Sequence, residues 1–369
     1  MIYFVHNWGE NPERSWSGTP MGIHNAFKKQ IKIQDIKIHL TKKDLLRQKL
    51  KRGVLKLKGK KDFEELRVKL EENKIRDYPY DDAPIFMFSE YITPYLSHSY
   101  VFIDLSVDYL YDLYITHSEM LDYCQSVSIN VDLHSIQKRR EMSLSYMQDC
   151  QGIFTMSKWL RDDLVNRTHI PESKVHYVGG GCNIDSSMIQ DGLKQGNKFL
   201  FIGTDFKCKN GKLVYDAFRS LQKKYPEIEL YIAGPDKQPE TIETGNGVYF
   251  LGYRTHEQIA ELYNQCDYFV MPSLFDAYGL VFGEALIYGL PCIGKNILAM
   301  PEFIESGKNG YLLENNDLNE LCDLMEKMML NKDMKQYVYN HRNDYIQQYS
   351  WEKVTNRMID VMKKDGYLI

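Results

Sequence analysis

Short, mainly apolar runs recur along this chain and alternate with segments of helical pattern. The runs are four or five residues long and include residues 2–5, 84–88, 100–103, 152–156, 199–202, 229–233 and 268–271. Runs of this length are typical of strands that are buried on both faces of a parallel sheet. Strands that alternate with helices favour an α/β fold in which helices cover both faces of the sheet. We therefore expect doubly wound parallel sheets.

A polar, glycine-rich stretch at residues 179–197 divides this series into two blocks. Such a change of composition is typical of a domain boundary. The length of 369 residues also fits two domains, because domains usually hold about 100–200 residues. We expect an N-terminal Rossmann-like domain over residues 1–190 and a C-terminal one over residues 191–349.

The composition excludes several classes of protein. Hydrophobic residues make up 43% of the chain and charged residues 26%, which excludes a disordered protein. The formal net charge of −4 gives no general basic excess, so we expect no nucleic-acid partner. Seven scattered cysteines without a C-x-x-C pair argue against a disulfide framework or a zinc knuckle and indicate a reducing compartment. Because no apolar stretch approaches 18 residues, the expected location is the cytoplasm.

Residues 42–61 depart from the even balance of charge. This segment holds ten basic residues and one acid, Asp44, interleaved with leucine and valine. One interpretation is a solvated, lysine-rich helix. The other is a surface that meets an anionic membrane or an anionic lipid-linked acceptor, peripheral to the inner face of the plasma membrane. Binding of nucleic acid is less favoured, because the interleaved residues are aliphatic rather than aromatic.

The most informative segment is residues 272–286, where a strand is followed by a loop and a helix start. Ligands of open α/β sheets lie outside the carboxyl ends of strands, and N–H groups at a helix start favour phosphate. Asp276 lies in the loop, and Glu284 follows eight positions later, about one turn into the helix. Both acids can therefore face one ligand. The alternative is that Glu284 only stabilises the helix dipole.

This segment resembles the signature of the retaining glycosyltransferase family 4, an acid, seven residues and a glutamate around a Phe-Gly-Leu run. Asp276 and Glu284 occupy that frame, with Tyr278, Gly279 and Leu280 in place of Phe-Gly-Leu. Further segments that resemble family motifs follow in the same order as in the family, at residues 16–20, 154–160, 180–183, 201–211, 233–235, 250–253 and 301–302.

The resemblance implies a GT-B fold, in which two Rossmann-like domains face a cleft and a last helix, here residues 350–369, crosses back to the first domain. It also implies transfer of a sugar, with retained anomeric configuration, from a UDP-, GDP- or ADP-sugar to a saccharide or lipid-linked saccharide acceptor. The pathway would be the synthesis of a cell-surface polysaccharide. The sequence has no D-x-D run in a strand-end loop, so we expect no metal, and no cofactor beyond the nucleotide sugar as co-substrate.

The resemblance assigns roles to residues of the C-terminal domain. Glu284 would accept hydrogen bonds from the ribose, Asp276 would lie against the donor sugar, and Lys209 would neutralise the leaving diphosphate. The other residues implied on the donor side are Gly279, Leu280, Tyr278, Gly203, Thr204, Lys207, Tyr253 and Arg254, with Gly18 and Thr19 from the N-terminal domain.

Two features depart from the family pattern. Asp276 replaces the more usual glutamate and is one methylene shorter. A basic partner of Lys209 is expected where this chain has Thr204 and Cys208, and Lys207 is the candidate substitute. These departures keep open a catalytically silent carbohydrate-binding or partner subunit. A nucleotide-sugar epimerase on the same fold is a further alternative.

The polar group near the reacting carbon comes, in the family, from the N-terminal domain. Asp104 follows a buried strand and is favoured for this role over His134, because an isolated histidine is more often structural. Ser106 and Glu90 are the further candidates on the acceptor side.

Overall fold

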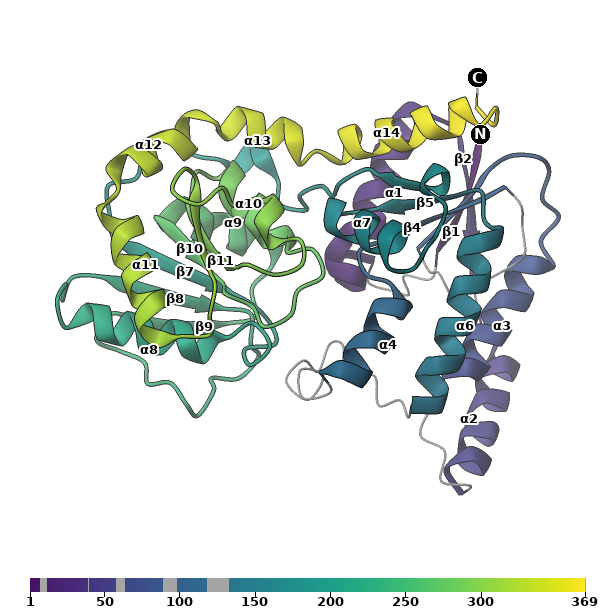
Figure 1. Cartoon of the computed structure of the whole chain (residues 1–369), viewed down its shortest axis with the longest axis horizontal. Coiled ribbons are helices and arrows are strands. Elements are labelled where there is room, and N and C mark those ends of the chain that lie inside the picture. The colour runs from purple at the N-terminus through teal and green to yellow at the C-terminus, as the bar shows by residue number, and fades with distance from the viewer. Residues whose placement is uncertain (7–11, 39, 58–63, 89–97, 118–132, 369) are drawn as a thin grey trace. The chain divides into compact units, whose positions relative to one another are not determined.

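The computed structural model describes the chain except for residues 7–11, 39, 58–63, 89–97, 118–132 and 369 (Figure 1). The described residues form two units. The N-terminal unit holds the chain up to Gly179 together with Trp351–Ile369, and the C-terminal unit holds Gly180–Ser350. The change of unit falls between Gly179 and Gly180, inside the glycine-rich stretch. The boundary expected from the sequence lay in the same stretch, after residue 190.

The N-terminal unit contains a six-stranded sheet in the order β2-β1-β3-β4-β5-β6, and each neighbouring pair of strands is parallel. Its strands are β1 (Ile2–His6), β2 (Ile33–Lys37), β3 (Ile85–Met87), β4 (Ser99–Ile103), β5 (Gly152–Thr155) and β6 (Val175–Tyr177). Strands β1, β3, β4 and β5 are buried along their whole length. Their continuous apolar runs are therefore those of central strands covered on both faces.

The described helices of this unit surround the sheet (Figure 1). They are η1 (Pro12–Gly18), α1 (Thr19–Gln30), α2 (Lys42–Leu57), α3 (Glu64–Arg76), α4 (Val107–Thr116), α6 (Leu133–Asp149), α7 (Lys158–Asn166), η2 (Glu172–Lys174) and α14 (Trp351–Lys364). Side-chain caps fix where two of them begin. The hydroxyl of Ser106 accepts from the N–H of Tyr109 in α4, and that of Ser157 from the N–H of Leu160 in α7.

The last helix, α14, packs against α1 and so returns the chain to the N-terminal unit (Figure 1). Gly22 of α1 makes this approach possible, because a Cβ atom there would lie 2.4 Å from Nε1 of Trp351. The amide of Gln30 donates to Oγ1 of Thr355 at 2.7 Å. The expected return of the C-terminal helix is confirmed.

This packing makes a prediction about two helical glycines. Gly22→Ala should lower the free energy of unfolding by about 1–3 kcal/mol, because the added methyl group overpacks the contact with Trp351. Gly53→Ala is the matched control, since no atom lies within 4 Å of a Cβ at Gly53 in α2. It should raise stability by up to about 1 kcal/mol. Urea unfolding of both variants measures the difference, and equal stability of Gly22→Ala and wild type would contradict the α1–α14 contact.

The C-terminal unit contains a second six-stranded parallel sheet, in the order β12-β11-β10-β7-β8-β9. Its strands are β7 (Lys198–Ile202), β8 (Glu229–Ala233), β9 (Val248–Gly252), β10 (Tyr268–Val270), β11 (Cys292–Lys295) and β12 (Gly310–Leu313). The chain passes from β7 to β8 and β9 and returns to the other side of β7 with β10. The carboxyl ends of β7 and β10 therefore form the point of strand-order reversal at which such sheets bind ligands.

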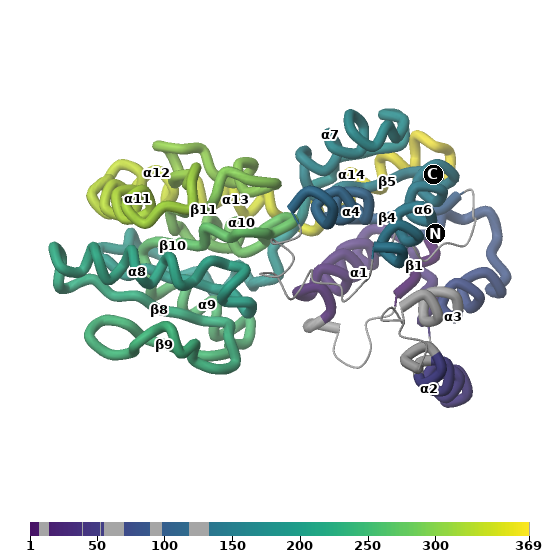
Figure 2. Tube along the Cα trace, turned by 60° about the horizontal axis from the view of Figure 1, so that its bottom comes forward, coloured from purple at the N-terminus to yellow at the C-terminus, as the bar shows by residue number. Residues whose placement is uncertain are grey.

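Helices cover both faces of this second sheet (Figure 2). They are α8 (Gly211–Gln222), α9 (His256–Gln265), α10 (Leu280–Ile287), α11 (Leu318–Leu330), α12 (Lys332–Asn340) and α13 (Arg342–Gln348), with the short turns η3 (Ser186–Met188) and η4 (Met300–Glu302). The two doubly wound parallel sheets expected from the sequence are confirmed. Among the described residues, no helix is long and apolar enough to cross a membrane.

Candidate active site

Lys209 and Asp276 meet at the strand-order reversal of the C-terminal sheet. Lys209 lies in the loop after β7, and Asp276 lies in the loop after β10. The Nζ atom of Lys209 is 2.6 Å from Oδ2 of Asp276 and 3.4 Å from the carbonyl oxygen of Phe275. About four fifths of each side chain is buried, with 19% and 18% exposed. The structure therefore brings together two residues that are 67 positions apart in the chain.

Hydrogen bonds join the two loops and hold this pair in place. The N–H of Leu274 donates to the carbonyl of Cys208 at 2.8 Å, and the hydroxyl of Ser273 donates to the same carbonyl at 3.2 Å. The amide of Asn210, the residue after Lys209, donates to the carbonyl of Pro272 at 3.1 Å. Since these contacts use backbone atoms on both loops, the position of Lys209 relative to Asp276 is part of the fold of this unit.

Gly279, three residues after Asp276, is the N-cap of helix α10. Its φ of +88° is left-handed, a conformation that a glycine adopts without strain. No side chain caps this helix end. The first N–H groups of a helix have no partners within the helix, and together with the helix dipole they favour an anion. Leu280 is the first residue of α10, so the expected anion-binding N–H groups lie beside the Lys209–Asp276 pair.

Glu284 is buried in the middle of α10, with 6% of its surface exposed. Its Oε1 accepts from the N–H of Asn183 at 3.3 Å, and its Oε2 accepts from the hydroxyl of Tyr263 at 3.3 Å. Burial raises the pKa of Glu284 to about 7, although these two hydrogen bonds act in the opposite direction. A carboxyl group that titrates near neutral pH is typical of functional sites. The sequence had no signal for Tyr263 or Asn183 as its partners.

Five other residues predicted on the donor side lie on two segments of the C-terminal unit. Gly203, Thr204 and Lys207 share the loop after β7 with Lys209, and Thr204 and Lys207 are exposed. Tyr253 and Arg254 follow β9 at the edge of the sheet. These positions remain predictions.

Tyr278 has a contact that the sequence could not show. Its side chain is buried, and its hydroxyl accepts from the N–H of Gly180 at 2.9 Å. Its ring also packs at 4.9 Å against Phe303. The Tyr278 side chain thus fixes the first residue of the C-terminal unit to the loop that carries Asp276, and its role toward a donor remains a prediction.

In the N-terminal unit, the loop before α1 meets the loop after β4. The indole Nε1 of Trp16 donates to Oδ2 of Asp104 at 3.1 Å. Trp16, Ser17 and Gly18 all have positive φ, at 46°, 54° and 85°. Left-handed backbone at two residues other than glycine is strained, and such strain gathers at functional sites. Trp16 was not among the predicted site residues, and only its place in the 16–20 motif could have indicated it.

The remaining predicted residues of this unit are placed as follows. Thr19, the first residue of α1, is buried. Ser106 is buried and caps α4, which gives it a structural role. His134 is exposed in the first turn of α6. Glu90 lies outside the described residues.

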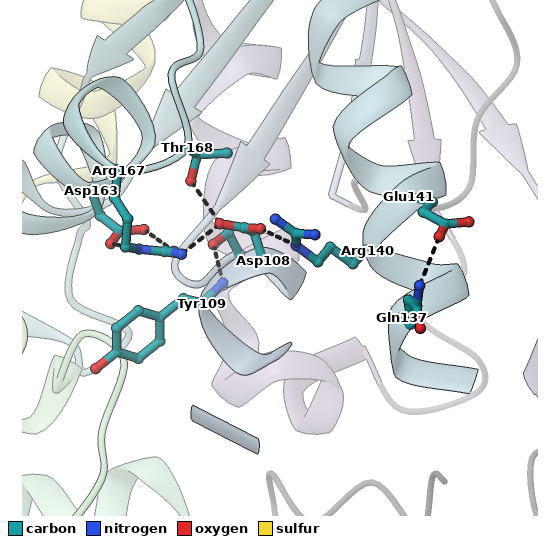
Figure 3. A network of polar contacts seen from close by, with 9 residues as sticks. Asp108, Tyr109, Gln137, Arg140, Glu141, Asp163, Arg167 and Thr168 are labelled. Carbon is teal, nitrogen blue, oxygen red and sulfur yellow. Dashed lines mark hydrogen bonds and ion pairs between the residues drawn. The ribbon is translucent and has the colours of Figure 1, made fainter. Parts of the chain in front are cut away.

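A buried ionic network lies at the start of α4, the helix that follows Asp104 in the chain (Figure 3). Asp108, in the first turn of α4, is 2% exposed and is paired with Nε of Arg140 from α6. Its Oδ2 lies 2.7 Å from NH1 of Arg167, after α7, and accepts from Thr168 at 2.9 Å. Burial alone would raise the pKa of Asp108, but these partners hold it below its ordinary value. The network ties α4, α6 and the end of α7 together, so it fixes where α4 begins.

The described part of the chain holds no group of three or more histidine, cysteine, aspartate or glutamate side chains arranged to hold a metal ion. The ammonium of Lys209 supplies a cationic group at the candidate site.

Comparison with protein families finds a match to the C-terminal unit. Residues 185–349 match the model of the family described as "Glycosyl transferases group 1". This part of the chain is therefore similar to group 1 glycosyltransferases. Lys209, Asp276 and Glu284 all lie inside the matched residues. The resemblance to glycosyltransferases that the sequence motifs indicated is confirmed at the level of group 1.

Similar proteins match the chain in part. An uncharacterized glycosyltransferase of Methanocaldococcus jannaschii is 23% identical over 241 residues, which cover 60% of this chain and 61% of that protein. The serotype-specific mannosyltransferase WbdA of Escherichia coli is 23% identical over 239 residues, 59% of this chain and 29% of WbdA. The alignments with these relatives thus span less than two thirds of the relatives' own lengths.

Solved structures match nearly the whole chain. Sucrose-phosphate synthase from Thermosynechococcus elongatus superposes with a TM-score of 0.66 and 13% identity, over 98% of both chains. Anabaena HepE, solved in complex with UDP and glucose, superposes with a TM-score of 0.63 and 13% identity, over 98% of this chain and 99% of HepE. At this identity the likeness concerns the fold. The GT-B fold class expected from the sequence is confirmed.

Proposed function

We propose that this protein is a retaining glycosyltransferase that moves a sugar from a nucleotide-sugar donor to a saccharide or lipid-linked saccharide acceptor. The observation that carries the proposal is the Lys209–Asp276 pair at the strand-order reversal, beside the N-terminus of α10. A cation and free helix N–H groups at the carboxyl ends of parallel strands are a site for a diphosphate.

The donor would be held by groups of the C-terminal unit. The N–H groups at Gly279 and Leu280 would donate to the diphosphate, and the Glu284 carboxylate would accept hydrogen bonds from the ribose hydroxyls. An ammonium group has three N–H donors. Lys209 can therefore keep its contact with Asp276 while it donates to a diphosphate oxygen. Asp276 would lie against the donor sugar.

Transfer needs stabilisation of the charge that develops on the leaving diphosphate. Lys209 and the N–H groups of α10 would supply this stabilisation, so that no metal is required. The leaving diphosphate would accept the proton of the acceptor hydroxyl on the face from which it departs, which retains the anomeric configuration. In the N-terminal unit, Asp104 is the proposed polar group near the reacting carbon, with Gly18 and Thr19 donating to the diphosphate.

The acceptor is proposed to be a growing cell-surface polysaccharide on a lipid carrier, so the enzyme would act in the cytoplasm at a membrane surface. The relative named a serotype-specific mannosyltransferase supports a saccharide acceptor of this class. HepE is described in complex with UDP, which makes UDP the first nucleotide to test, followed by GDP and ADP.

Thermal melting with nucleoside diphosphates tests donor binding. A nucleotide at about 100 times its Kd should stabilise the protein by roughly 2.7 kcal/mol. Glu284→Ala should remove most of this effect without unfolding the protein. If UDP, GDP and ADP all leave the melting temperature of the wild type unchanged, the proposal fails.

Incubation of the enzyme with UDP-, GDP- and ADP-sugars, with and without a saccharide acceptor, then distinguishes the functions. A transferase forms an elongated saccharide only when the acceptor is present. An epimerase converts the donor alone, and a silent subunit binds nucleotide but forms no product. Either of these two results would replace the proposed function.

A further inference from the structure

Helix α2 presents aliphatic side chains to solvent and polar side chains to the protein. Asp44 and Gln48 are 8% and 7% exposed. Leu46, Leu50 and Val54 are 58%, 64% and 52% exposed. Residues four positions apart lie on one face of a helix, so these three residues form one apolar stripe. This arrangement is the reverse of a surface helix whose apolar face points into the core.

Local contacts fix this orientation of α2. The N–H of Thr41 donates to Oδ2 of Asp44 at 2.9 Å, and the N–H of Asp44 donates to Oγ1 of Thr41 at 3.2 Å. This reciprocal pair is a capping box, which sets where the helix begins. Nζ of Lys74 in α3 lies 3.8 Å from Oδ2 of Asp44. Asp44 therefore faces α3, and the exposed apolar stripe lies on another side of the helix. Helix α2 itself lies at the outside of the N-terminal unit (Figure 2).

Basic side chains flank the apolar stripe on both sides. At 100° per residue, Lys42 and Lys49 lie along one edge of the stripe, and Arg47 and Lys51 lie along the other. All four are exposed. The one acidic residue of α2 is Asp44, which is buried. The outer face of α2 therefore combines an aliphatic stripe with positive charge.

We propose that this outer face of α2 binds the surface of an anionic lipid bilayer. An aliphatic stripe between basic edges suits a helix that lies in the plane of the interface, with its apolar side chains among the acyl chains and its cations at the headgroups. Binding to a second copy of this face would bring the basic edges together, which is repulsive. The proposal goes beyond the sugar transfer and does not depend on it, because its readout is binding to lipid.

The test is flotation of the full-length protein with phosphatidylcholine vesicles that contain or lack phosphatidylglycerol. The wild type should float with the anionic vesicles and remain in solution with the neutral ones. Leu46→Ser with Leu50→Ser should lower the partition coefficient by about tenfold or more. Lys42→Glu with Lys49→Glu should lower it by about fivefold or more for each residue. Because all four positions are exposed, both variants should melt at the temperature of the wild type.

Matched controls come from the C-terminal unit. Leu330→Ser replaces a leucine that is 60% exposed, and Lys327→Glu with Lys332→Glu reverses two exposed charges. Both controls should float like the wild type. The proposal is overturned if the wild type does not bind anionic vesicles, or if the α2 variants bind as the wild type does. The proposal is also overturned if light scattering shows that the wild type is a dimer and that Leu46→Ser with Leu50→Ser is a monomer. The apolar stripe would then be the contact between two copies of the chain.

Discussion

Lys209→Met is expected to lower kcat for sugar transfer by about 10²–10³-fold, the range found when one preorganised donor to a developing negative charge is removed. The methionine side chain is similar in length but carries no charge. The variant loses the contacts of Lys209 with Asp276 and Phe275. The loops after β7 and β10 should stay in place, because the hydrogen bonds made by Ser273, Leu274 and Asn210 still join them. The loss should appear in kcat more than in KM for the acceptor.

The matched control for this variant is Lys212→Met. Lys212 lies three residues further along the chain, on the exposed side of α8, where it pairs with Asp216 at 2.6 Å. Its replacement should leave kcat within about twofold, as expected for a surface ion pair of little energetic weight. Steady-state kinetics compare kcat of both variants with that of the wild type, and thermal melting verifies that both are folded. Equal kcat values for Lys209→Met and wild type would remove Lys209 from the mechanism.

Glu284 is expected to make stability and nucleotide binding depend on pH. Its pKa is raised by burial to about 7 in the folded protein, against 4.5 ordinarily. Its stabilising contribution is therefore fully present below about pH 4.5 and is lost as the pH rises through about 7. The loss amounts to about 3 kcal/mol, since one pKa unit corresponds to 1.36 kcal/mol. In urea unfolding between pH 5 and pH 8, the free energy of unfolding of Glu284→Gln should not show this decrease with rising pH.

Ionisation of Glu284 lowers the stability of the fold but should favour nucleotide binding, and Glu284→Gln tests this second effect too. The ionised carboxylate of Glu284 is the better acceptor for two ribose hydroxyls, because hydrogen bonds to a charged group contribute about 1.5–3 kcal/mol. At pH 8, Glu284→Gln should weaken binding of the nucleoside diphosphate by about tenfold to a hundredfold. The difference should shrink below pH 6, where the wild-type carboxyl is protonated.

Glu261→Gln serves as the control for both measurements, since Glu261 is exposed on α9. Its pH profiles for unfolding and for nucleotide binding should match those of the wild type. Parallel profiles for Glu284→Gln and wild type, in titration calorimetry across this pH range, would show that the buried carboxyl has no part in binding the donor.

The fold and the donor side of the candidate site could be predicted because their signals are local. Continuous apolar runs mark the central strands, and the segment from Asp276 to Glu284 is one loop and one helix. The order of strands then brings Lys209 to Asp276, since both follow adjacent strands of the sheet. The position of a residue in such a segment can be predicted from the residues next to it in the sequence.

The missed features depend on packing between distant segments. Asp108 looks like an ordinary acid in the first turn of a helix, and nothing nearby in the sequence indicates that Arg140 and Arg167 converge on it. The contact of Trp16 with Asp104 spans 88 positions. The basic segment 42–61 left two interpretations open, because only the tertiary structure shows which face of α2 is turned outward.

The position of helix α14 at the end of the chain also affects the order in which the two units can fold during synthesis. It buries Trp351, Val354 and Met358 in the N-terminal unit, yet the ribosome makes it after the whole of the C-terminal unit. Domains generally fold as units while the chain emerges. The described residues of the C-terminal unit run from Gly180 to Ser350. These residues are therefore all synthesised before α14. The N-terminal unit begins first and is completed last, so the face of α1 that receives Trp351 stays uncovered during most of translation.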